Sequence, residues 1–409
     1  MNPTLRPRDP KEVAAALEWA VAEKKTLEIV GQGSKRAIGR AAQWDMTLDL
    51  SSLSGVTLYE PEELVLSARA GTPLAEIEAL LADKGQELAF EPTDYGPLSG
   101  RASGQGTLGG VLAANLSGPR RIKAGAARDH FLGVTAVSGR GETFRSGGRV
   151  VKNVTGYDLC KVLAGSWGTL AAMTDVTVKV LPRAETEETL LILGLDDIAA
   201  ASAMTAALGS PDDVSGAAHL PAAAAARVMR SAAGGGAVTA IRLEGVAVSI
   251  TQRKRTLETL LKPFGPLLTV GEAASRALWR AVRDVLPLAA NGAESATRPV
   301  WRISTAPTRG PDLVAQIAGR TQAEYLYDWG GGLIWISLAP RDDGGARLVR
   351  RAVATHGGHA TLVSAPPAVR AAVDVFSPQE RSLAALTKRV KEAFDPEGVL
   401  GPGRMWAGV

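Results

Sequence analysis

The sequence predicts an α+β protein in which a glycine-rich, two-part domain over residues 1–183 precedes an alanine-rich domain over residues 184–375. Three observations support this. The total of 409 residues suits two or three domains. Loops that combine glycine with polar neighbours are concentrated before residue 183, and a repeated strand and helix pattern follows it. We expect the first domain to divide near residue 55, into 1–55 and 56–183, and residues 376–409 to pack back on it.

The first domain begins with a helix that is capped by Asp9, with Pro10 in its first turn and an apolar stripe that ends at Val21. A short apolar strand at 27–30 and a second strand near 47–50 follow it. The remaining expected elements are two strands within 56–70, a helix over 72–82, and strands near 132–138, 141–146 and 174–180.

Residues 189–270 and 300–363 each have the order strand, helix, strand, strand, helix, strand. This is the order of a ferredoxin-like unit, and two such units side by side would form one extended antiparallel sheet covered by helices. A helix around 275–286 joins the units, and the alanine run at 221–226 favours another helix because alanine is the best helix former. A last helix is expected near 379–394.

Composition excludes several functional classes. Net charge is +4 without a dense basic run, and aromatic residues make up 5% of the chain, so neither a nucleic-acid surface nor a base-stacking platform is expected. No signal peptide and no transmembrane segment are expected, because no apolar run is long enough. The single cysteine, Cys160, cannot form an intramolecular disulfide or ligate an iron–sulfur cluster, and it suits a reducing, cytoplasmic location. It is expected to be a packed small residue.

The loop at 31–35 follows a strand, and its small residues let consecutive backbone N–H groups face one anion such as pyrophosphate. A Rossmann fingerprint would need a glycine where Arg36 stands, and a Walker loop is absent. An ordinary glycine turn remains the alternative reading of this loop taken alone.

A second loop at 106–110 leads into small residues at 111–118, which would let a flat ligand approach the backbone. Asn115 and Ser117 offer hydrogen bonds, and Gly110 is expected to need a positive φ that valine would not tolerate. The alternative is a tight helix start packed against a sheet. A third polar stretch at 152–161 continues to 165–170, and Lys152 or Lys161 could neutralise phosphate, or else lie on the surface paired with an acid.

Together these stretches resemble the FAD-binding domain of the vanillyl-alcohol-oxidase type, also called the PCMH domain, over residues 8–183. The resemblance implies FAD bound between two subdomains, and non-covalently, because Ser34 and Lys35 stand where many relatives carry a linking histidine. The cofactor-binding residues that it implies are Gly31, Gln32, Gly33, Ser34, Lys35, Gly106, Thr107, Leu108, Gly109, Gly110, Ala113, Asn115, Ser117, Gly118, Lys152, Asn153, Gly165, Gly168 and Thr169.

Stretches at 327–331, 357–362, 394–396 and 401–405 extend the resemblance to the family of FAD-binding E subunits of bacterial glycolate oxidase. That family implies a complex with a homologous FAD-containing D subunit and an iron–sulfur F subunit, which oxidises glycolate to glyoxylate. It also implies membrane association only through the complex, at its periphery.

The stretch at 327–332 belongs to the second domain, which forms the cap over the FAD domain in related 2-hydroxy-acid dehydrogenases. It lacks the histidine that those enzymes carry there, so we assign no catalytic residue and expect the chain to be inactive alone. Arg302 is the candidate partner for the carboxylate of a small 2-hydroxy acid. No metal site is expected, because His356 and His359 would point to opposite faces of a strand. A self-sufficient FAD-dependent dehydrogenase and a non-catalytic scaffold remain the alternatives.

Overall fold

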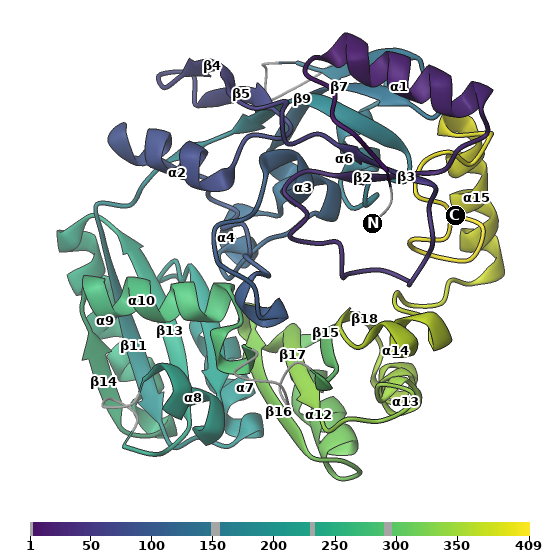
Figure 1. Cartoon of the computed structure of the whole chain (residues 1–409). Helices are drawn as coiled ribbons and strands as arrows, with labels where there is room; N and C mark the ends of the chain where they lie inside the picture. Colours follow the sequence, from purple (N-terminus) through teal and green to yellow (C-terminus); the bar gives the residue numbers. More distant parts are fainter. Residues whose placement is uncertain (1–2, 149–155, 230–233, 290–296) are drawn as a thin grey trace.

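The computed structural model describes residues 3–148, 156–229, 234–289 and 297–409, and Lys152 and Asn153 lie outside these ranges. Within these ranges the strands form sheets of three, two, eight and five strands. Figure 1 shows the elements before residue 183 above the eight-stranded sheet, with the C-terminal residues against the N-terminal ones. None of the helices in the described ranges is long and apolar enough to cross a bilayer.

A parallel three-stranded sheet opens the chain, in the order β1 (Thr4–Leu5), β3 (Met46–Asp49), β2 (Leu27–Val30). Helix α1 (Pro10–Ala22) begins at Asp9, whose carboxylate accepts the backbone N–H groups of Lys11 and Glu12, as the capping pattern predicts. Its buried face packs with the apolar residues of β2 and β3, in a core that also includes Val137, Ala172, Val399 and Leu400.

A five-stranded antiparallel sheet follows, and its strands in spatial order are β4 (Val56–Glu60), β5 (Val65–Arg69), β9 (Ala171–Lys179), β7 (Phe131–Ser138) and β8 (Thr143–Gly147). Helices α2 (Leu74–Asp83) and α3 (Leu108–Ala114) pack against it. Strand β10 (Leu181–Pro182) then pairs with β6 (Gln86–Glu87). The elements agree with those predicted from the sequence to within a few residues.

The eight-stranded sheet confirms the expected extended antiparallel architecture. Its strands in spatial order are β14 (Leu267–Val270), β11 (Thr186–Leu193), β13 (Val238–Gly245), β12 (Gly216–Leu220), β16 (Ala323–Asp328), β17 (Leu333–Leu338), β15 (Val300–Ser304) and β18 (His359–Ser364). Numbered within each unit this order is 4-1-3-2 and then 2-3-1-4, so two ferredoxin-like units meet at their second strands. The alanine run forms α8 (Ala222–Val228), as predicted.

A polar cluster holds the two units together where their backbones pair least. Strands β12 and β16 share a single residue pair, His219 with Tyr327. The hydroxyls of Tyr325 and Tyr327 both donate to Asp197, at 2.9 and 2.8 Å, and the buried His219 ring lies 3.4 Å from the same carboxylate. Contacts between side chains therefore join β12 and β16, where few backbone pairs do so.

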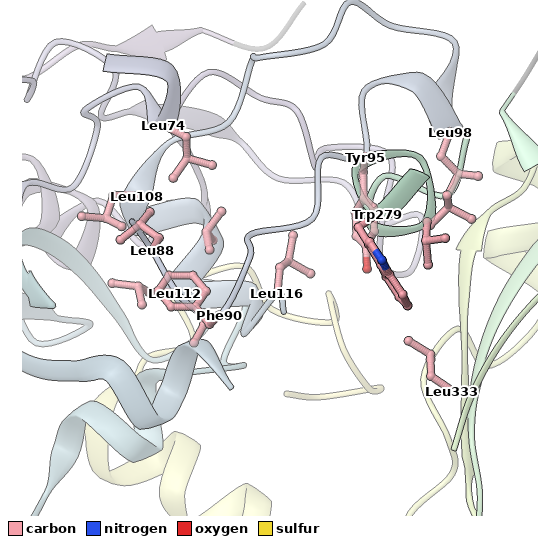
Figure 2. Close-up of a cluster of buried hydrophobic side chains, with 14 of the residues drawn as sticks. Leu74, Leu88, Phe90, Tyr95, Leu98, Leu108, Leu112, Leu116, Trp279 and Leu333 are labelled. Atoms are coloured by element: carbon pink, nitrogen blue, oxygen red, sulfur yellow. The ribbon is translucent and has the colours of Figure 1, made fainter. Parts of the chain in front are cut away.

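The two faces of the large sheet bury different partners, because successive strand residues point to opposite faces. Leu190 and Ile192 belong to a core that also holds residues of the helices α7 (Asp197–Leu208), α9 (Ala247–Leu261), α12 (Gly310–Ala318) and α13 (Ala346–His356). Leu191 joins the opposite core, which also holds residues of the first half of the chain. Figure 2 shows this core running from Leu108 and Leu112 to Trp279 and Leu333.

Buried charges also join the two halves of the chain. Arg242 of the large sheet donates to Glu91 at 2.8 Å, and Arg120 donates to Glu244 and Glu87 at 2.7 Å each. Burial opposes ionisation of Glu91, but Arg242 and Arg120 lower its pKa to about 2. Removal of one partner would leave a buried charge unpaired, so this network fixes how the halves fit.

The C-terminal residues pack against the first half of the chain. After α15 (Arg381–Phe394), the Leu27 N–H donates to the Val399 carbonyl at 2.8 Å, and the Gly401 N–H donates to the Leu27 carbonyl at 2.9 Å. The buried Lys391 donates to Asp395 and to the carbonyl of Thr169, at 2.6 and 2.7 Å. These bonds place the final residues beside the loop that follows β2.

Candidate functional site

The loop after β2 forms one wall of a cavity. Residues 31–35 line it together with the start of α3, residues 167–168 and Arg404 from the C-terminal segment. Gly33 has φ +74°, a backbone conformation that favours glycine. Of the expected cofactor residues, the cavity brings together Gly31, Gln32, Gly33, Ser34, Lys35, Thr107, Gly109, Gly110, Ala113 and Gly168.

Close approach of neighbouring segments explains one glycine in each of the two glycine-rich loops. A Cβ at Gly31 would lie 2.6 Å from Thr107 Oγ1, and one at Gly109 would lie 2.7 Å from Ala70 Cβ. The expectation for Gly110 was wrong, because this residue is part of helix α3 and has no positive φ. Its Cβ would instead lie 3.1 Å from Thr107 Oγ1 and point into the space near Lys35 Nζ, 3.7 Å away.

The charges around this cavity favour an anion. Lys35 Nζ donates to Ser34 Oγ at 3.2 Å, and burial, with a smaller effect of Arg404, lowers the pKa of Lys35 to about 8. Arg404 is buried, donates to the Lys35 carbonyl at 3.1 Å and has its Nε without a hydrogen-bond partner. The buried Glu28 beneath the loop pairs with Arg36 and also lies 3.7 Å from Arg404, and Asp94 partly offsets the effect of burial on the pKa of Lys35. The three cations Lys35, Arg36 and Arg404 therefore outnumber the two neighbouring acids.

A second cavity of about 270 Å³ adjoins the first and shares Ala114 and Trp167 in its wall. It lies between residues of the first half of the chain and the β15–β18 side of the large sheet. Its other lining residues are Ile38, Tyr95, Asn115, Leu116, Ser117, Arg121, Gly165, Arg302, Ser304, His359, Thr361, Val363 and Phe376, none of which is acidic.

Arg121 and Arg302 approach this cavity from the two halves of the chain and stack on one indole ring. Their guanidinium carbons lie 4.3 and 5.0 Å from the centroid of Trp329. Burial lowers the pKa of both arginines, and Arg302 adds to the effect on Arg121. The indole N–H of Trp329 donates to the Gly118 carbonyl at 3.0 Å, which fixes the ring between the halves.

Several expected ligand residues have structural surroundings instead. Leu108 and Thr169 are buried beside other core residues, and Gly118 contacts Trp329 through its carbonyl. Gly106 borders a different, smaller pocket. Asn115 Oδ1 and Ser117 Oγ face the second cavity but accept the backbone N–H groups of Arg128 and Ala127, at 2.9 Å each.

The histidines and the cysteine are separated from one another. His356 Nε2 pairs with Gln316 Oε1 at 2.8 Å at the end of α13, whereas His359 begins β18 and lines the second cavity. Burial, with Arg302 and Arg121, lowers the pKa of His359. Cys160 is buried, and burial raises its pKa to about 11, so it is packed as expected.

The sequence patterns did not predict that Arg404, Trp167, Tyr95 or Arg121 would line a cofactor or substrate cavity. Arg404 stands 369 positions after Lys35, and only the fold brings the two together. Its one sequence signal was a glycine and proline-rich C-terminal motif. Arg121 follows another arginine, Arg120, and nothing in the sequence distinguishes the paired residue from the unpaired one.

The residues present fit FAD. A dinucleotide needs cations or N–H groups for its pyrophosphate and small residues along its flat parts. The first cavity offers Lys35, whose ammonium has one hydroxyl partner, and the Nε of Arg404, which has no hydrogen-bond partner, and the small residues Gly110, Ala113 and Ala114 line its wall.

Comparisons with known proteins agree with this reading. Residues 3–147 match the family model described as FAD binding domain. The chain is 34% identical over 392 residues to the glycolate oxidase subunit GlcE of Escherichia coli strain K12, covering 95% of each chain. It is 30% identical over 190 residues to the glycolate oxidase subunit GlcD of Bacillus subtilis strain 168, which is 46% of this chain and 39% of that one.

The fold is shared with a solved oxidase. The structure of 4-ethylphenol oxidase from Gulosibacter chungangensis superposes with a TM-score of 0.73 at 14% identity, covering 99% of this chain and 89% of that chain. At that identity the likeness shows the architecture alone.

Proposed function

Since this chain belongs to the family of the glycolate oxidase subunit GlcE and carries an FAD binding domain, we propose that it is the FAD-binding subunit of a glycolate oxidase complex. The observation that carries the proposal is the 34% identity over 95% of both chains, because it includes the large sheet and the C-terminal segment as well as the FAD domain.

The cavity supports a defined role for individual residues. Residues 31–35, with Lys35 and Arg404, would hold the pyrophosphate of FAD, and Gly110 and Ala113 would leave room beside it. Bound flavin supplies an acceptor for the hydride from the carbon that carries the hydroxyl group. Lys152 and Asn153 remain proposed contacts. We propose that FAD is bound without a covalent bond, because Ser34 and Lys35 stand where many relatives carry a linking histidine.

The proposed partners are a homologous FAD-containing D subunit and an iron–sulfur F subunit. The similarity to both a GlcE and a GlcD protein supports a pair of homologous flavoproteins. One cysteine cannot ligate an iron–sulfur cluster, so electron transfer through such a cluster needs another chain. We place the complex in the cytoplasm, with any membrane association made through the partners.

The test compares the chain alone with the assembled complex. Dye reduction with saturating glycolate is measured for the flavin-loaded chain, for the chain with its D and F partners, and for the partners without it. We expect the isolated chain to be at least about 100-fold slower than the assembly, the usual loss when a general base is absent. Comparable turnover by the chain alone would contradict the subunit proposal.

One observation favours a second candidate, a self-sufficient 2-hydroxy-acid dehydrogenase. His359 lines the second cavity, where burial, with Arg302 and Arg121, lowers its pKa and so favours the neutral ring that accepts a proton. In that case His359→Gln would lower turnover of the isolated chain, and the assay above decides between the two candidates.

A further inference from the structure

We propose that Arg121 and Arg302 together form a receptor for the carboxylate of a small hydroxy acid, with one arginine supplied by each half of the chain. The proposal rests on the function proposed above and names the ligand chemistry of its second cavity. It assigns the chain a substrate-binding site of its own, besides whatever site a partner flavoprotein contains.

The first argument is that neither arginine has a directly bound partner among the described residues, although Asp129 and Asp328 partly offset the burial that lowers the pKa of Arg121 and Arg302, respectively. Among the described residues, neither guanidinium forms an ion pair or donates a hydrogen bond, although both line the same cavity. Nearby arginines have partners: Arg120 and Arg242 bind carboxylates, and Arg350 donates to backbone carbonyls. Both arginines are half-buried, and burial lowers the pKa of each, so an anion from solution would offset the cost of their charge.

The second argument is geometric. Both guanidinium carbons contact the Trp329 ring, at 4.3 and 5.0 Å from its centroid, so they lie at most about 9.3 Å apart. Stacking on the indole leaves the edges of the guanidinium groups, which carry the N–H donors, free for a ligand. One carboxylate can accept two parallel hydrogen bonds from an arginine, one on each oxygen. The remaining lone pair of each oxygen is then available to another donor.

The third argument is the chemistry of the remaining wall. None of the described residues that line the cavity is acidic, whereas Tyr95, Ser304, His359 and Thr361 offer groups that can bind a hydroxyl. A volume of about 270 Å³ suits a small organic acid rather than a macromolecule. The wall therefore matches a ligand with one charged end and a neighbouring hydroxyl.

A phosphate of FAD is the competing anion for these two arginines. Lys35 and Arg404 already supply cations in the first cavity, beside the 31–35 loop that we propose holds the pyrophosphate. The carboxylate proposal therefore requires that loss of Arg302 leaves FAD binding intact, and the test is built on that distinction.

The test is calorimetric titration of the holoprotein with oxalate, a carboxylate that carries no oxidisable hydroxyl, at low salt. We expect binding in the wild type, and a Kd raised about 10- to 100-fold in Arg302→Gln and in Arg121→Gln, the usual loss of a charged hydrogen bond. The flavin-to-protein ratio should stay unchanged in both variants. The neutral glycolamide should not compete with oxalate, because it lacks the carboxylate.

Arg347→Gln is the matched control, since this arginine is 89% exposed on α13 and away from the cavity. It should bind oxalate as the wild type does. Failure of the flavin-loaded wild type to bind oxalate would overturn the receptor but leave the proposed FAD function intact. Loss of flavin in Arg302→Gln would assign the arginine to the cofactor and also overturn the receptor. Folding of each variant is checked by circular dichroism, and two variants from different elements guard against one that misfolds.

Discussion

Replacement of Lys35 by methionine should affect cofactor binding and stability in opposite directions. Lys35 lines the first cavity, and its ammonium has only the Ser34 hydroxyl as a hydrogen-bond partner, at 3.2 Å. Methionine has a similar length without the charge. The variant should therefore bind FAD less tightly, because the pyrophosphate loses a cation, while the apoprotein gains stability, because a buried charge is removed.

The magnitude follows from the electrostatics of the site. Burial lowers the pKa of Lys35 from 10.5 to about 8, so the folded apoprotein disfavours the charged form. At pH 7 both states hold the proton, and the charge costs at most about 3 kcal/mol of the free energy of unfolding. Between about pH 8 and 10.5 the unfolded chain binds more protons, so wild-type stability rises with pH and the difference from Lys35→Met shrinks.

The assay combines FAD titration with chemical unfolding of the apoprotein. We expect the Kd for FAD to rise about 10- to 100-fold, the effect of a lost charged hydrogen bond. We also expect the apo variant to unfold at a higher denaturant concentration than the wild-type apoprotein, and this difference should be larger at pH 7 than at pH 10. Lys11→Met on the exposed side of α1 should change neither quantity. Unchanged FAD affinity in Lys35→Met would refute the placement of the pyrophosphate beside this loop.

Three further predictions concern the cofactor and the large sheet. Acid precipitation of the loaded chain should release FAD into the supernatant, because Ser34 and Lys35 cannot form the histidine link, and flavin that stays in the pellet would contradict this. Gly110→Val should abolish flavin loading while the circular dichroism of the apo form stays near wild type, since its Cβ points toward Lys35 Nζ; normal loading would show that the ligand lies elsewhere. Burial raises the pKa of Asp328 to about 7, so the folded state binds more protons between about pH 4 and 7. Wild-type stability relative to Asp328→Asn should therefore fall across that range, and a constant difference in unfolding free energy would show that Asp328 is not buried as described.

The architecture was largely predictable because local patterns determine it. The period of apolar residues places the strands and helices, and the repeated order of elements predicts the paired ferredoxin-like units. The side chains at their junction were not predictable. His219 and Tyr327 belong to different units and are 108 positions apart in the chain, and only the pairing of β12 with β16 brings them to Asp197.

The site was predictable only where consecutive residues form it. The 31–35 loop and Gly110 could be assigned from small residues in sequence, although the helical backbone of Gly110 shows that a glycine can be required for space rather than for φ. Leu108 belongs to the same motif but points into the core. Arg404 and Arg121 are functional candidates only because of what lies beside them in space, which single-sequence patterns do not encode.

The most direct test of the central claim is the flavin content of the purified chain. The account predicts an oxidised flavin absorbance spectrum and close to one FAD for each chain, or uptake to that ratio when the apoprotein is titrated with FAD. A folded chain that is isolated without flavin and does not take up FAD would contradict the account, whatever its similarity to other flavoproteins.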